Sequence, residues 1–467
     1  MISLTQSHGR STLGIAHGIV LFLACTSLVS LFLVDGSIPI VRWALLMAAL
    51  LPLGAALKAR DGSLLLSPAY LLAGIVIFFY SVLPYAIAET YIAGDIEEHH
   101  VRGVLQPEII SYFGSRAESV VMGFGAAVLI LHCAARAITK PAPPSRVQTI
   151  SFVEKLIQLV AVIMAIVLLL VAVLTNRSGT VFSVILTAYL PIQSVILIYL
   201  IHQHRTSGIP SLAKVIFFAV VCILPPAVLG QGKIPVFIFS AAAIYLLSFG
   251  LPSLRKTLVV FFVGTLLFLL FVPTSLVIRE NDLSKISTTT IYKKVSHVVL
   301  MKSFTRQTAT GYCLKNIVDR HWDDALKMDK QFFWLEGMVP RVLWPEKPNL
   351  SHGSYYADMY CGRLKYAAHN KTHSSSITLL GQPIIMGGMT SLLLHGGILV
   401  FFLGGLTWIA RRSQGLGRIF VFALLPWWID FDQDYVLYAA NLAKFALMIG
   451  CGVVVTSFIS SRFARTP

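Results

Sequence analysis

Long apolar runs dominate the chain, and short polar stretches separate them. A helix needs about 20 mostly apolar residues to cross a bilayer. By this criterion the pattern predicts twelve membrane-spanning helices. They are expected at about residues 13–34, 40–57, 67–88, 118–136, 155–175, 180–202, 214–230, 234–250, 257–278, 386–410, 419–435 and 437–460.

One long polar stretch, residues 279–385, interrupts this pattern. It holds fifteen Lys or Arg and nine Asp or Glu, a local charge of about +6. Apolar residues within it repeat at helical spacing and predict an amphipathic helix of about four turns. These are Leu314, Ile317, Val318, Trp322, Ala325 and Leu326. We therefore expect spans one to nine in residues 1–278, a partly helical loop in 279–385, and spans ten to twelve in 386–467.

Composition supports an all-α polytopic membrane protein. The chain has 467 residues, of which 56% are hydrophobic and only 12% charged, whereas soluble domains carry about 25% charged residues. The formal net charge of +16 would suit a nucleic-acid binder. In a membrane protein, however, excess Lys and Arg mostly fix the topology, so no nucleic-acid partner is expected.

The charges of the short loops predict the orientation. With the N-terminus inside, the inner loops hold sixteen basic residues against two acidic ones, Asp61 and Glu154. The outer short loops hold five basic and ten acidic residues. Because cytoplasmic loops are enriched in Lys and Arg, both termini are expected in the cytoplasm. The loop at 279–385 is then expected outside, on the periplasmic side.

Two of the six cysteines lie in the long loop. Cys313 and Cys361 are the two cysteines expected on the oxidising side, where disulfides persist, and we predict a disulfide between them; two free thiols are the alternative. The six cysteines of the chain show no spacing typical of a metal site. We therefore expect no metal ion and no cofactor.

Cationic residues of the outer face are candidates for binding phosphate. Lys233 lies in a tight glycine-containing turn, and Arg279 ends a span. Arg341 and Lys347 flank Trp344 in a proline-rich run. The planar fork of arginine suits phosphate oxygens, and the tryptophan ring suits the face of a sugar. A hairpin turn with a snorkelling lysine and a structural Pro-Trp corner are the alternative interpretations.

Proton transfer has candidates in the same loop. Asp358, His352, His369 and His373 are possible bases, because histidine has a pKa near neutral pH. A single loop histidine is more often simply exposed. Within the membrane, His395 and Lys444 lie in spans ten and twelve, where ionisable residues are candidates for function.

Two motifs and the layout carry a resemblance to a known family. The motifs are the run from Pro340 to Pro348 (PRVLWPEKP) and the run from Thr378 to Pro383 (TLLGQP), which leads into a glycine-rich span. With many spans and one long outer loop late in the chain, the sequence resembles the Wzy-type polymerases of O-antigen or exopolysaccharide repeat units. That family often has an acidic residue where Gln382 stands and an arginine where Lys233 stands.

The resemblance implies a metal-independent glycosyltransferase of the bacterial inner membrane. Donor and acceptor would be glycans linked to undecaprenyl diphosphate, and further partners would be membrane lipids, a chain-length regulator and a flippase. The expected catalytic residues are Arg341, His369, His373 and Asp358. The expected substrate-binding residues are Lys233, Arg279, Lys347, Trp344 and Lys444.

Two other functions stay open. An O-antigen ligase has a similar layout and donor, and the run from Ala368 to Asn370 is similar to the histidine region of the ligases. A transporter or flippase of lipid-linked sugars is the non-enzymatic alternative. The long outer loop argues against it, since alternating access uses sites near the midplane between repeats, and the sequence has no internal repeat.

Overall fold

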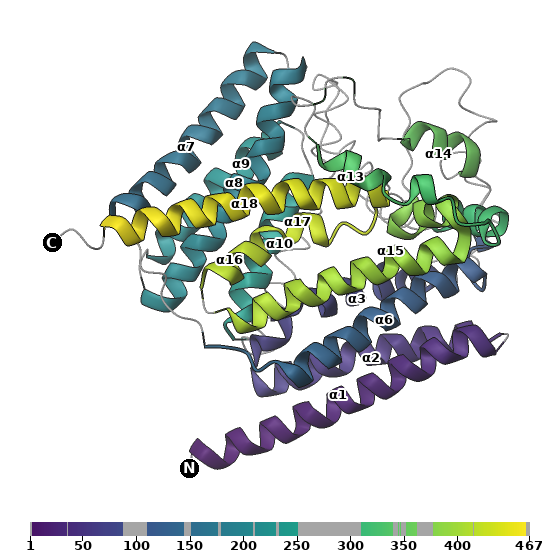
Figure 1. Cartoon of the computed structure of the whole chain (residues 1–467). Helices are drawn as coiled ribbons and strands as arrows, with labels where there is room; N and C mark the ends of the chain where they lie inside the picture. Colours follow the sequence, from purple (N-terminus) through teal and green to yellow (C-terminus); the bar gives the residue numbers. More distant parts are fainter. Residues whose placement is uncertain are drawn as a thin grey trace, which may run out of the picture.

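The structure is a computed structural model of the whole chain (Figure 1). It describes residues 2–34, 36–86, 110–143, 151–175, 179–208, 211–229, 233–250, 310–339, 344, 346, 352–361, 377–413 and 415–463. All regular structure among these residues is helical, and none of them lies in a β-strand. The expected all-α class is thereby confirmed for the described part of the chain.

The first group of helices packs side by side. It comprises α1 (Ile2–Leu33), α2 (Ile38–Ala59), α3 (Pro68–Ile77) and α6 (Arg116–Ile138). A short 3-10 helix, Gly62–Leu66, precedes α3, and a π-helical segment, Phe78–Val82, continues it. Ser67 caps the start of α3, because its side chain accepts a hydrogen bond from the backbone N–H of Tyr70.

The second group is formed by four consecutive helices. They are α7 (Ser151–Leu174), α8 (Gly179–Ser207), α9 (Leu212–Val228) and α10 (Lys233–Ser248), and each contacts at least two of the others. The last group lies between these two groups and joins them. Its members are α15 (Thr378–Arg412), α16 (Leu416–Ala423), α17 (Leu425–Trp428) and α18 (Tyr435–Phe463). α15 packs on α3 and α6, while α16 and α18 reach α8.

The described part of the polar loop is short and helical. Residues 310–321 form one helix, and η4 (Met328–Lys330), α13 (Phe333–Met338) and α14 (Gly353–Tyr360) follow. Leu314, Ile317 and Val318 are buried as the periodicity predicts. The helix ends at His321, so the expectation that it includes Ala325 and Leu326 is wrong. The chain turns away at Trp322 because its next residues dock on α15.

Among the described residues, seven helices are long and apolar enough to cross a membrane. They are Ile15–Leu33, Ile38–Ala59, Pro68–Ala86, Arg116–Ile138, Val184–Ser207, Thr378–Arg412 and Tyr435–Gly452, and each coincides with an expected span. Three shorter apolar helices, Gln158–Leu174, Leu212–Val228 and Ile234–Ser248, fall where spans five, seven and eight are expected. The expected ninth span lies outside the described residues. The total of twelve spans therefore stays a prediction.

The expected eleventh span, 419–435, is not one continuous helix. The chain turns at Leu424, and Pro426 stands in the first turn of the next short helix, α17. A proline inside a helix removes one backbone hydrogen bond and clashes with the preceding turn. The indole of Trp428 donates to the carbonyl oxygen of Val421 at 3.0 Å. Non-helical backbone within a membrane is tolerated where it is buried in protein. This segment meets that condition, because Trp428 and Phe431 are fully buried.

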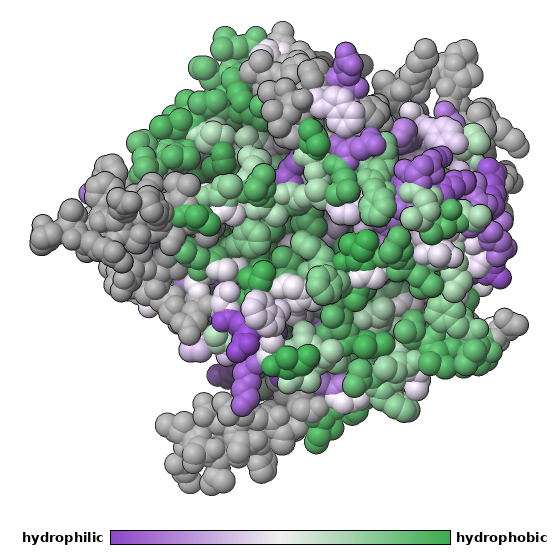
Figure 2. All heavy atoms as spheres, viewed as in Figure 1, coloured by the Kyte–Doolittle hydropathy of each residue, from purple (hydrophilic) through white to green (hydrophobic). Residues whose placement is uncertain are grey.

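The molecule has two distinct ends. In Figure 1, α1 begins and α18 ends at the left, whereas α14 and the start of α15 lie at the right. We name the right side the loop end and the left side the termini end. Figure 2 shows an apolar belt between a hydrophilic surface at the loop end and a smaller hydrophilic patch near the end of α15. The start of α1 and the end of α18 thus lie at the same end of the bundle. The topology expected from the loop charges stays a prediction.

Candidate functional site at the loop end

The predicted site residues fall partly outside the described structure. Arg279, Arg341, Lys347, His369 and His373 all lie outside the described residues. Of the others, Asp358 is half-buried on α14, and the Trp344 side chain is 37% exposed. Lys233 is the first residue of α10, and Lys444 is half-buried on α18. The described residues therefore bring Asp358 to the loop end and keep Lys444 within a span.

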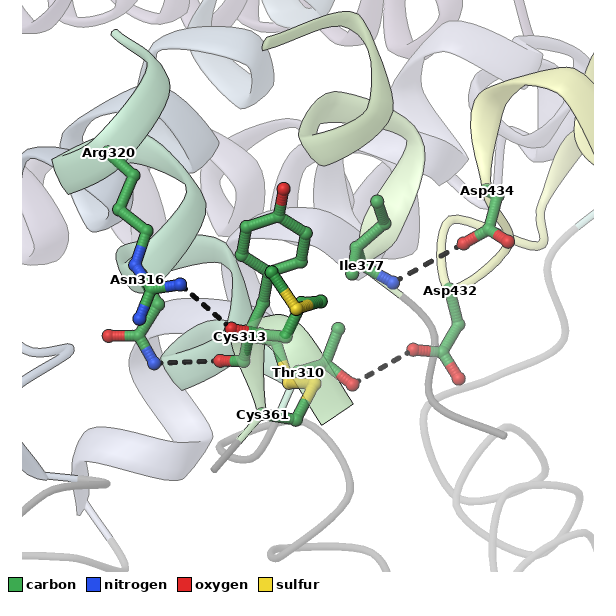
Figure 3. The surroundings of a disulfide bond; sticks show 10 residues. Thr310, Cys313, Asn316, Arg320, Cys361, Ile377, Asp432 and Asp434 are labelled. Carbon is green, nitrogen blue, oxygen red and sulfur yellow. Dashed lines mark hydrogen bonds between the residues drawn. A yellow bond between two sulfur atoms is a disulfide. The ribbon is translucent and has the colours of Figure 1, made fainter. Parts of the chain in front are cut away.

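A disulfide between Cys313 and Cys361 holds this region together (Figure 3). Its Cα atoms are 4.6 Å apart, and the pairing predicted from the sequence is confirmed. It ties the end of α14 to the helix at 310–321. Two side chains of that helix add to the tie: Asn316 donates to the carbonyl oxygen of Tyr360 at 2.7 Å, and Arg320 to that of Met359 at 3.0 Å. The last carbonyls of α14 are thereby satisfied.

His321 lies between a carboxylate and a phenol. Its Nδ1 is 3.0 Å from Asp324 Oδ2, and its Nε2 is 2.9 Å from the Tyr360 hydroxyl. The hydrogen bond from His321 lowers the pKa of Asp324, and burial raises the pKa of Tyr360 to about 12. In the neutral ring the carboxylate favours a proton on Nδ1, leaving Nε2 to accept from Tyr360. The carboxylate thus orients a potential base.

A second candidate group is the buried carboxylate of Asp434. Asp434 precedes α18 and is only 4% exposed. Its Oδ1 is 3.5 Å from the backbone N–H of Ile377, at the start of α15 (Figure 3). Burial, with a smaller contribution from Asp432, raises the pKa of Asp434 to about 7. Its protonation state therefore changes near neutral pH, as suits a general acid or base.

Three further polar groups surround this carboxylate. Burial raises the pKa of Tyr356, on α14, and the negative charge of Asp434 raises it further. The side chain of Gln382 hydrogen-bonds to the Tyr356 hydroxyl and accepts from the backbone N–H of Val436 at 2.9 Å. Asp432 accepts a hydrogen bond from Thr310 at 3.4 Å. Four segments distant in sequence thus meet around Asp434: residues 310–321, α14, the start of α15 and the turn before α18.

Helix α15 is interrupted at Gly388, where its backbone contacts Trp322 of the long loop. Gly388 has a positive φ of 57°, and an added Cβ would lie 2.4 Å from the carbonyl oxygen of Trp322. The backbone N–H of Met389 donates to that same oxygen at 3.0 Å. Only glycine combines this conformation with so close an approach. The break falls at the expected start of the tenth span, while α15 itself already begins at Thr378.

His395 belongs to the same junction. It is fully buried on α15, with Nδ1 2.9 Å from the carbonyl oxygen of Ser391 and Nε2 3.1 Å from that of Gln331. Gln331 in turn donates to the carbonyl oxygen of Met386 at 2.9 Å. Both ring nitrogens of His395 thus contact the backbone. This gives the in-span histidine a structural role, which is to anchor residues 328–331 to α15.

Sequence reasoning missed His321 and Asp434 as site residues. Asp430, Asp432 and Asp434 form an acidic turn between apolar runs, which is a detectable signal. His321 and Asp324 stand three residues apart, a spacing that lets side chains meet at a helix end. Among the described residues no group of three or more His, Cys, Asp or Glu could hold a metal ion. No family model, curated protein or solved structure matches the chain.

Proposed function

We propose that this protein polymerises oligosaccharide repeat units carried on undecaprenyl diphosphate. The reaction would take place at the periplasmic face of the bacterial inner membrane. One observation carries the proposal: Asp434, a buried carboxylate with a pKa near 7, lies beside the disulfide-tied helix α14 at the loop end of a membrane-spanning bundle. A titratable group at that position suits the transfer of a glycan to an acceptor hydroxyl, which releases a proton.

The disulfide supports the proposed orientation. Disulfides persist on the oxidising side of the inner membrane and are rare in the cytoplasm. The Cys313–Cys361 pair therefore favours a periplasmic loop end, independently of the loop charges. With the termini end in the cytoplasm, the twelve-span topology with both termini inside is our proposal for the whole chain.

The chemistry assigns roles to the residues. A hydroxyl oxygen of the acceptor glycan attacks C1 of the donor sugar, and the bond from C1 to the diphosphate oxygen breaks. The diphosphate leaves with the electron pair, and the hydroxyl proton passes to a base. We assign Asp434 as this base, since a pKa near 7 leaves a good share of it ionised at neutral pH. Asp358, His369, His373 and the oriented His321 are the competing candidates.

Cations must receive the departing diphosphate. We propose Arg341 as the residue that holds it, with Arg279, Lys233 and Lys347 around the phosphates. Such contacts strengthen as charge develops on the leaving group. The exposed ring of Trp344 offers a flat surface for a sugar, and Lys444 is the candidate cation deeper in the membrane.

Deletion of the gene tests the class of reaction. A polymerase mutant makes lipopolysaccharide capped with a single repeat unit. A ligase mutant accumulates polymer on the carrier without capping, and a flippase mutant traps repeat units inside. We expect the first profile, and either of the other two would replace the polymerase assignment.

Complementation with single variants tests the base. Asp434→Asn should lower polymer synthesis about 100-fold or more, since general bases contribute roughly 10²–10⁴-fold. Its protein level should be normal, because asparagine resembles the protonated carboxyl. Asp323→Asn is the matched control, since Asp323 is an exposed carboxylate of the long loop at 279–385. Polymer of normal length from Asp434→Asn would exclude this residue as the base and leave the deletion result to decide the function.

A further inference from the structure

Three arginines meet at the termini end of the bundle. Arg136 lies in the last turn of α6, Arg411 at the end of α15, and Arg418 in α16. Arg411 is 2% exposed and Arg418 3% exposed. Arginines that only fix topology are expected at the membrane surface in contact with water. Arg411 and Arg418 are instead enclosed by protein, and Arg136 is half-buried.

Their contacts within the chain are neutral. Arg411 donates to the hydroxyl and the carbonyl oxygen of Thr139, at 2.9 and 2.8 Å. Arg418 donates to the carbonyl oxygens of Ala410 and Ala142. These acceptors are mostly backbone oxygens at or just beyond helix ends, which carry partial negative charge. The Nη1 atoms of Arg136 and Arg411 are buried and have no hydrogen-bond partner among the described residues.

A histidine faces the same place. His132 lies one turn before Arg136 on α6 and is fully buried. Its Nδ1 is 2.8 Å from the Ser67 hydroxyl, while its Nε2 has no hydrogen-bond partner in the described structure. His132 is within electrostatic reach of Arg136 and Arg411. Three buried nitrogen atoms, on two helices, thus have no hydrogen-bond partner among the described residues.

Among the described residues, few carboxylates lie near these arginines. Asp61 is the acidic residue that acts on Arg136 and Arg411, and it already accepts two hydrogen bonds from Ser63, each at 2.8 Å. The sequence contains no Asp or Glu in residues 119–153, 155–279, 359–429 or 435–467. Buried cations without a counter-ion are strongly unfavourable, and arginine does not lose its proton in proteins. An anion from outside the chain would resolve this.

We propose that Arg136, Arg411 and His132 bind a phosphate group at the termini end of the bundle. A guanidinium fork matches phosphate oxygens and binds them through charge-assisted hydrogen bonds. The group belongs either to an anionic lipid headgroup or to a soluble phosphate compound, since both have the same recognising chemistry. This site is at the end opposite to Asp434 and does not depend on the proposed polymerase activity.

Purified protein in an uncharged detergent, with native lipid removed, tests the site. Short-chain phosphatidylglycerol and inorganic phosphate are titrated separately, and short-chain phosphatidylcholine serves as the lipid control. Thermal stability reports binding, because a ligand of the native state raises the melting temperature with its concentration. Native mass spectrometry counts the molecules bound. We expect saturable binding of one phosphate group to the wild type.

Variants locate the binding. Arg136→Gln should weaken the apparent affinity roughly 10-fold or more, as loss of a hydrogen bond to a charged group does, and Arg136→Lys should recover part of it. Arg412→Gln is the matched control, because Arg412 is the exposed neighbour of Arg411, and its affinity should change less than twofold.

Each outcome decides the proposal. Saturation by inorganic phosphate identifies a soluble ligand, and saturation by phosphatidylglycerol alone identifies a lipid headgroup. If neither probe binds the wild type saturably, the proposal is overturned, whether or not the variants fold. Equal effects of Arg136→Gln and Arg412→Gln would also overturn it, and the arginines would then serve only to hold residues 139–142 on the bundle.

Discussion

The bundle buries arginine at both of its ends, but with different partners. At the loop end, Arg42 donates two hydrogen bonds of 2.9 Å to Glu118, which also accepts from Ser81 at 2.7 Å and from the backbone N–H of Gly114 at 2.8 Å. At the termini end, Arg411 and Arg418 donate to Thr139 and to backbone oxygens only. The first cation is hydrogen-bonded to a carboxylate, and the second pair is hydrogen-bonded to neutral oxygens only.

The difference follows from the charge pattern of the loops. The expected outer loops hold acidic and basic residues, so a buried outer cation finds a carboxylate within the chain. The expected inner loops hold sixteen basic residues against two acidic ones. The enrichment of Lys and Arg in inner loops therefore leaves few carboxylates on the inner side to act as counter-ions. A buried carboxylate can lose its charge by binding a proton, as Asp434 does near neutral pH. A buried arginine keeps its charge, because it does not release its proton in proteins.

Breaking the Arg42–Glu118 pair should have the largest effect. The side chains are 2% and 0% exposed, and removal of one partner leaves a buried, unpaired charge. Glu118→Gln should cost about 3–5 kcal/mol, seen as a much lower melting temperature in detergent or as loss of the protein from membranes. The double variant Arg42→Met with Glu118→Leu should regain most of this stability. Equal damage in the double and single variants would contradict the electrostatic explanation.

The pH dependence of stability should reveal the buried carboxylate. Asp434 has a pKa of about 7 in the native state, against about 3.9 when unfolded. Between these values the native state binds more protons, so stability falls as pH rises from about 4 to about 7 and is level above. The difference corresponds to at most about 4 kcal/mol. Melting temperatures measured from pH 4 to 8 should fall less steeply for Asp434→Asn than for the wild type.

Other carboxylates also titrate in this range, so a control is needed. Asp323→Asn removes an exposed carboxylate of the long loop at 279–385 and should leave the wild-type pH profile in place. Parallel profiles for the wild type and Asp434→Asn would mean that Asp434 is ionised throughout, and the assignment of a base with a pKa near 7 would fail with it.

Removal of the disulfide should loosen α14. The bond closes a loop of 48 residues, and disulfides typically contribute about 2–4 kcal/mol by restricting the unfolded chain. Cys313→Ser should lower the melting temperature, and a reducing agent should lower that of the wild type equally. Cys25→Ser, at an exposed free cysteine, is the control. A wild-type melting temperature that does not respond to reduction would show that the loop end is held by its packing and hydrogen bonds alone.

The fold was predictable where apolar runs are long and uninterrupted. Seven expected spans are confirmed as helices because about 20 apolar residues allow no other structure in a bilayer. The prediction of a continuous eleventh span is wrong, because the helix is interrupted at Leu424 and Pro426. Side chains of Trp428 and Tyr438 donate hydrogen bonds to backbone carbonyls there, and the apolar composition gives no sign of this interruption. The loop helix ended early for a similar reason, since residues after His321 dock on the glycine break of α15.

The candidate site was harder to predict. The cysteine pair follows from counting the thiols on one side of the membrane, and it is confirmed. Asp434 becomes unusual only through burial against α14 and the start of α15, which lie far from it in the sequence. The same holds for His321, whose partner Tyr360 is 39 residues away. Sequence patterns identify which residue types are present, but long-range packing decides which of them share an environment.

The smallest effect is expected from an exposed ion pair, and it sharpens the comparison between buried and exposed charge. Lys315 and Asp319 lie 2.5 Å apart on the loop helix, closer than the 2.8 Å of Arg42 and Glu118. Their side chains are 25% and 49% exposed, so water screens the attraction and already solvates each charge. Pairs at this spacing on a helix contribute about 0.3–0.5 kcal/mol. Asp319→Asn should thus shift the melting temperature by a degree or so at most, and added salt should abolish the shift. A loss as large as that of Glu118→Gln would mean that distance, and not burial, decides what a charge pair contributes in this protein.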